Sequence, residues 1–70
     1  MYFDRFDICE AYYVLAHDYG MYGIISRLER MGYRPSPMAG SFNHLTENGQ
    51  EIYLAAEARI EIAGYGAVLR

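Results

Sequence analysis

Helix-breaking residues divide this 70-residue chain into three segments whose apolar residues recur at helical spacing. Gly20 and Gly32 follow the first two segments, and a stretch with both prolines, 33–45, precedes the third. Glycine is favoured just after a helix, and each proline removes a backbone donor, which disfavours a central strand over 33–45. The pattern predicts a mainly α, single three-helix domain over 1–70, with a Pro/Gly loop or a rudimentary wing between the second and third helices. The helices are expected at about 7–19, 21–32 and 47–63.

The first helix should have apolar surface on more than one side. One apolar face runs from Ile8 to Tyr19 at i, i+4, i+7 and i+11, whereas Tyr13 and Val14 point away from it. Such a helix either lies at the centre of the domain or offers a second face to another chain. A homodimer through Tyr13 and Val14 is therefore one expectation.

The start of the third helix offers two candidate caps. Thr46 could cap it with Glu47 in the first turn, or Asn48 could cap it with Glu51 three residues on, as a capping box.

Cysteine count and charge limit the setting of this chain. Cys9 is the only cysteine, so the intrachain disulfides that small secreted domains usually need are excluded. The N-terminal residues lack the pattern of a signal peptide, and no apolar run approaches the roughly 18 residues of a membrane span. We therefore expect a cytoplasmic protein with no membrane partner. The net charge of −3 disfavours a broad nucleic-acid footprint.

The sequence contains no convincing catalytic set. Cys9 and His17 would lie about 12 Å apart along one helix, too far for a thiolate–imidazole pair. A metal site built from His17, Asp18 and His44 would lack the short-spaced ligand pairs of zinc motifs, and no glycine-rich phosphate loop is present. We expect neither an enzyme nor a cofactor or metal site.

The basic residues are concentrated in the middle of the chain. All six are arginine, and 21–40 carries three of them against one glutamate, a net charge of +2. Arg27, Arg30 and Arg34 follow at i, i+3 and i+7 beside the second helix and could bind phosphates or carboxylates with forked geometry. The alternative interpretation is a solvated face that pairs with Glu29 or with acids of the flanking helices.

Aromatic residues point to a shared surface. Eight tyrosines and three phenylalanines exceed what the core of so small a domain can hide. Tyrosine and arginine are both enriched at protein–protein hot spots, although half-buried tyrosines with their hydroxyls in water are also common. The candidate partner-binding residues are Arg27, Arg30, Arg34, Tyr22 and Tyr33.

Two stretches, 25–33 and 45–53, resemble the C-terminal half of a MarR-type winged helix. In that family a recognition helix ends in a Leu-x-x-x-Gly phrase, here Leu28 to Gly32, and Leu-Thr-x-x-Gly opens the next helix, here Leu45 to Gly49. The resemblance implies a recognition helix in the major groove, with the arginine row on DNA.

The phrases at 7–13, 32–37 and 45–53 also look like those of small proteins from phages and mobile elements. This resemblance implies a small acidic protein that binds and inhibits or modulates host machinery, as anti-CRISPR proteins do. Our leading hypothesis is a non-enzymatic protein-binding module. The alternative is a winged-helix-like DNA-binding transcriptional regulator, with nucleic acid as its partner.

Overall fold

The computed structural model describes residues 4–33 and 40–64, and its elements are all helical. The mainly α, three-helix prediction is confirmed, and the described part of the segment between the second and third helices contains a short turn of helix and no strand. The elements are α1 (Arg5–Asp18), α2 (Tyr22–Arg30), the 3₁₀ helix η1 (Phe42–His44) and α3 (Glu47–Ala63).

Side-chain caps determine where α1 and α3 begin. Asp4 accepts a hydrogen bond of 2.7 Å from a backbone N–H of the first turn, so α1 begins two residues before the expected position. Thr46, not Asn48, caps α3, because its hydroxyl oxygen accepts from the Gly49 N–H at 3.0 Å. The same hydroxyl donates to Asp7 at 2.9 Å, so this cap also links the start of α3 to the first turn of α1.

Glycines end α1 and α2. Gly20 and Gly32 have φ values of +70° and +88°, which glycine adopts without a steric penalty. The next amides, those of Met21 and Tyr33, donate to carbonyls five residues back at 2.6 and 3.0 Å, which is the Schellman pattern. Because this motif closes α2 at Arg30, the helix is shorter than the expected 21–32.

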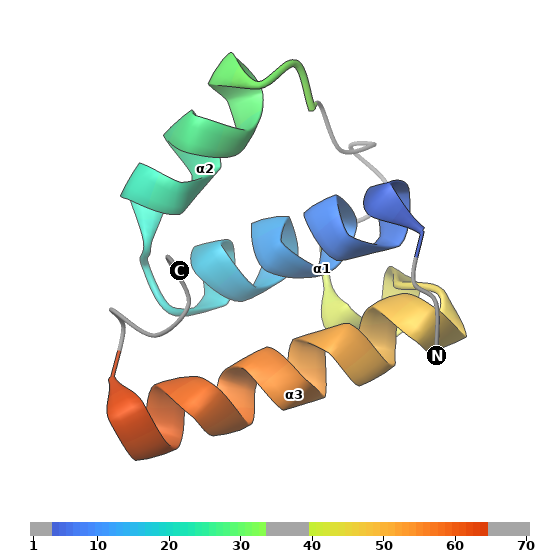
Figure 1. The fold of residues 1–70 in the computed structure, drawn as a ribbon. Coiled ribbons are helices and arrows are strands. Elements are labelled where there is room, and N and C mark those ends of the chain that lie inside the picture. The colour runs from blue at the N-terminus through green and yellow to red at the C-terminus, as the bar shows by residue number, and fades with distance from the viewer. Residues whose placement is uncertain (1–3, 34–39, 65–70) are drawn as a thin grey trace.

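Helix α1 lies at the centre, with α2 and α3 on opposite sides of it (Figure 1). Two hydrogen bonds show that α1 and α3 run in the same direction. Asp7, near the start of α1, bonds to Thr46 before α3, whereas Asp18 at the end of α1 accepts from the Tyr53 hydroxyl at 2.8 Å.

Two apolar clusters hold the helices together. The α1–α3 cluster comprises Ala11, Val14, Leu15, Leu45, Ile52, Tyr53, Ala56 and Ile60. The α1–α2 cluster comprises Cys9, Ala16, Ile24 and Leu28. Phe42 of η1 packs against the first cluster with its ring edge-on to Tyr53, the ring centroids being 5.1 Å apart.

The apolar surface on the far side of α1 is used inside the molecule. Val14 is 1% exposed within the α1–α3 cluster, and Tyr13 is half-buried against the α1–α2 cluster. The expected dimer face is therefore wrong at Val14, which is buried inside the molecule, whereas Tyr13 is only partly covered. The other expectation, that α1 is central, is confirmed.

Candidate functional site

One side of α2 is open to solvent. Its inner side is fixed by Ile24 and Leu28, which are buried against α1. The outer side contains two adjacent rows of residues spaced four apart. One row is Tyr22, Ser26 and Arg30, and the other is Gly23 and Arg27. We call these exposed residues the α2 face: Tyr22, Gly23, Ser26, Arg27 and Arg30.

The α2 face contains one aromatic ring and two cations, and the exposed Glu29 lies next to it on the same helix, so α2 as a whole carries a net charge of +1. Tyr22 is 65% exposed. Neither Arg27 nor Arg30 forms an ion pair with an acidic side chain in the described ranges, Glu29 included. Pairing of Arg27 or Arg30 with an acid thus has no support in this part of the chain, and both side chains are exposed, so a solvated face and a binding face both remain open.

The other two predicted residues are placed differently. Tyr33 follows the end of α2 and is half-buried against the α1–α2 cluster. The guanidinium carbon of Arg5 lies 5.5 Å from the centroid of its ring, a cation–π contact that joins this residue to the start of α1. The structure therefore places Tyr22, Arg27 and Arg30 on the exposed side of one helix, whereas Tyr33 lies beyond the end of that helix. Arg34 lies outside the described residues.

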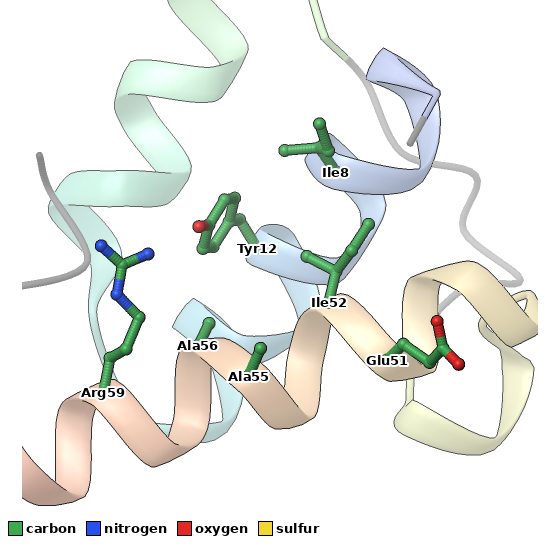
Figure 2. Close-up of a pocket in the computed structure, with 7 residues that line it drawn as sticks. All are labelled: Ile8, Tyr12, Glu51, Ile52, Ala55, Ala56 and Arg59. Carbon is green, nitrogen blue, oxygen red and sulfur yellow. The ribbon is translucent and has the colours of Figure 1, made fainter. Parts of the chain in front are cut away.

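A groove between α1 and α3 is a second candidate surface. Its volume is about 240 Å³, and its lining is mainly apolar. The floor and walls are formed by Ile8, Tyr12, Ile52, Ala55 and Ala56. Figure 2 shows Glu51 and Arg59 at opposite ends of the groove, so its apolar middle is bounded by one charge of each sign.

Sequence reasoning missed this groove. Its signal is nevertheless present in the third helix, where Glu51, Ala55 and Arg59 follow at i, i+4 and i+8 and therefore share one side. The contribution of Ile8 and Tyr12 from α1 depends on how two distant helices pack, which the helical spacing does not reveal.

Two tyrosines bond to carboxylates where α1 ends beside α3. The Tyr19 hydroxyl donates to Glu57 at 2.6 Å, and the Tyr53 hydroxyl donates to Asp18 at 2.8 Å. Burial of Tyr53 raises the pKa of its phenol, and the bond to Asp18 raises it further, so this hydroxyl stays protonated. These bonds hold α3 against α1 and occupy the polar groups that they join.

The residues considered for catalysis have different surroundings. Burial raises the pKa of the Cys9 thiol, which disfavours the reactive thiolate. His17 is exposed, and His44 shares a hydrogen bond of 2.7 Å with the Ser41 hydroxyl on the surface. Among the described residues, no group of three potential ligands could hold a metal ion.

None of the helices in the described ranges has both the length and the apolar character that crossing a bilayer requires.

Comparison with protein-family models, with curated proteins and with solved structures gave no match to this chain. The resemblances to winged helices and to phage proteins therefore remain predictions from short phrases, and the functional conclusion depends on the geometry of the α2 face.

Proposed function

We propose that this chain is a non-enzymatic protein-binding module that engages its partner through the α2 face. The observation that carries the proposal is the exposure, on one helix whose inner side is already packed, of Tyr22 and of two arginines without an ion-pair partner in the described ranges. Tyrosine and arginine are the side chains most enriched among interface hot spots, because they combine large contact area with directed hydrogen bonds.

The same face indicates the chemistry of the partner. Arg27 and Arg30 are three residues apart, so their side chains leave the helix as neighbours. Guanidinium groups bind carboxylates with two parallel hydrogen bonds. The partner surface should therefore carry at least two carboxylates for the arginines and an apolar pocket for the Tyr22 ring, about 8 to 12 Å further along the helix axis. In the setting suggested by the phage-like phrases, the module acts by occupying such a surface on host machinery.

A DNA-binding regulator is the second candidate, and one observation favours it. Helices α1 and α2 are joined by only three residues, 19–21, and meet at a steep angle with α2 outermost, as in a helix-turn-helix (Figure 1). Charge disfavours it, because α3 contains four glutamates and one arginine and the whole chain carries −3. The protein-binding function is therefore the stronger proposal.

The test compares two variants of the α2 face with a matched control. Tyr22→Ala and the double variant Arg27→Ala/Arg30→Ala alter the face, whereas Phe6→Ala removes a similarly exposed aromatic residue, 56% exposed, from α1. Partners captured from an extract of the source organism are identified by mass spectrometry, and their affinities are measured with purified proteins. We expect each face variant to weaken binding by about 30-fold, as loss of a hot spot does, and Phe6→Ala to have no effect.

Two results would contradict the proposal. Unchanged affinities in both face variants would show that the α2 face is not the site. Micromolar binding to duplex DNA at low salt that falls steeply as salt rises would favour the regulator instead.

A further inference from the structure

We propose that the groove between α1 and α3 is a homodimer interface in which α3 of a second copy lies antiparallel to α3 of the first. The inference starts from Glu51, Ala55 and Arg59, which lie on one side of α3 and are all exposed. Ala55 is the midpoint of this row, and opposite charges lie four residues to either side of it. Reversing the direction of the row therefore exchanges a negative end for a positive one.

This arrangement is complementary to itself. Glu51 and Arg59 are about 12 Å apart along the helix axis, too far to pair with each other. Neither forms an ion pair within the described ranges. A second α3 that crosses at Ala55 in the antiparallel direction places Glu51 of each copy against Arg59 of the other. Two-fold symmetry makes this contact twice, as closed dimers of identical chains require.

The apolar residues around this row favour the same occupant. The side chain of Ala55 is a single methyl group, which lets two helix backbones approach closely. Ile8 and Tyr12 on the α1 side of the groove are only half-buried, so an inserted helix would remove more of their surface from water. Ile62 lies seven residues after Ala55 on the same side of α3 and is 88% exposed, so the apolar row continues beyond Arg59.

The dimer leaves the α2 face free. Helices α2 and α3 lie on opposite sides of α1 (Figure 1), so a second copy against α3 does not approach the outer side of α2. A dimer would present the α2 face twice, which raises the apparent affinity for a partner with two sites. Self-association is measured without any other protein, so its outcome is independent of the proposed function.

Charge reversal tests the interface. Sedimentation equilibrium of the wild-type chain should show a monomer–dimer equilibrium. Glu51→Arg places arginine against Arg59, and Arg59→Glu places glutamate against Glu51, so each should raise the dimer dissociation constant by about tenfold. The double variant Glu51→Arg/Arg59→Glu restores both pairs and should return the constant close to the wild-type value.

Glu61→Arg is the matched control. It makes the same charge change as Glu51→Arg at another exposed position of α3, about a third of a turn away from Ala55, and should leave the dissociation constant unchanged. Circular dichroism verifies that each variant keeps its helices. A chain that stays monomeric at about 1 mM would overturn the proposal and leave the groove to a helix of another protein. A double variant weaker than either single variant would overturn it as well.

Discussion

Helices α2 and α3 pack against opposite sides of the same helix, but they are held in very different ways. Helix α3 has 17 residues, five of them buried, and the residues 46–63 form three side-chain hydrogen bonds to α1 and the residue after it. Helix α2 has nine residues, of which Ile24 and Leu28 are buried, and within the described ranges it forms no side-chain hydrogen bond to α1.

This difference divides the molecule into a supporting half, formed by α1 and α3, and an exposed half, formed by α2. Isolated helices shorter than about 12 residues are marginal in water, so α2 depends on its contact with α1. Its low local stability is typical of the segments that proteins use for binding, because few of their groups are committed to the core. The α1–α3 half provides the stable base, and α2 presents Tyr22 and the two arginines.

The largest effect should come from the core of the supporting half. Leu15 is fully buried in the α1–α3 cluster. Leu15→Ala should cost about 3 kcal/mol or more, since it removes a packed side chain and leaves a cavity. A domain of this size has a total stability of roughly 4–10 kcal/mol, so the variant should keep roughly 1–7 kcal/mol and unfold at a much lower urea concentration. Urea denaturation followed by circular dichroism measures this loss. If α3 kept its helical structure after α1 had unfolded, the two helices would not form one stable half, and the comparison would be contradicted.

A smaller and more local effect is expected in the exposed half. Leu28→Ala should cost about 2 kcal/mol and mainly release α2 from α1. Since Cys9 lies in the same cluster, its thiol should react faster with a disulfide reagent, while hydrogen exchange of the α3 amides stays slow. Leu54→Ala, at a leucine that is 52% exposed, is the control and should change neither rate. Equal loss of protection in α3 would show that the two halves unfold together.

The third prediction concerns the tyrosine bonds that distinguish α3. Tyr53→Phe removes the donor to Asp18 and should cost about 1–2 kcal/mol. Because burial raises the pKa of Tyr53 in the folded chain, the folded state favours the neutral phenol. The associated stability is complete below the unfolded pKa near 10 and is lost as the pH rises above it.

Urea titrations between neutral and alkaline pH test this prediction. The wild-type chain should lose stability above about pH 10, and Tyr53→Phe should lose less. Tyr22→Phe, at the exposed tyrosine of the α2 face, should keep the wild-type slope. Burial also raises the pKa of Cys9, so part of the loss persists in the variant. An identical pH dependence in wild type and Tyr53→Phe would contradict the assignment.

The smallest effects should come from two glycines, Gly20 after α1 and Gly23 in the first turn of α2. A Cβ at Gly23 would meet nothing within 4 Å, so Gly23→Ala should stabilise the helix by about 0.5 kcal/mol. Gly20 has a φ of +70°, so Gly20→Ala should destabilise the chain by about 1 kcal/mol although its space is also open. Thermal unfolding measures both changes. A loss of stability in Gly23→Ala would indicate that α2 does not behave as an ordinary exposed helix.

The sequence predicted the parts of this fold that depend on local spacing. Apolar periodicity and the glycines located all six ends of the three helices to within two residues. Met31 is the clearest error. Its spacing of seven residues from Ile24 and three from Leu28 predicts that it is buried with them, but α2 stops at Arg30 and Met31 is 57% exposed. Because Gly32 ends the helix, Met31 does not occupy the helical position that would place it on the buried side.

The sequence could not predict the parts that depend on distant contacts. The direction of α3 relative to α1, the groove and the tyrosine–carboxylate bonds all depend on residues at least 35 positions apart. Helical spacing describes one element at a time and carries no information about such pairs. The α2 face was easier to predict from the sequence. Tyr22, Arg27 and Arg30 all lie on one short helix, and its apolar residues show which side faces the core.

The parallel packing of α1 and α3 also affects how the chain assembles during synthesis. Both ends of α1 are bonded to residues that follow at least 35 positions later. A nascent chain that has emerged only as far as α2 lacks Leu45 and all of α3, so α1 has only the small α1–α2 cluster to pack against. We therefore expect the chain to gain its stable core late, after α3 has left the ribosome, and to form it in one step.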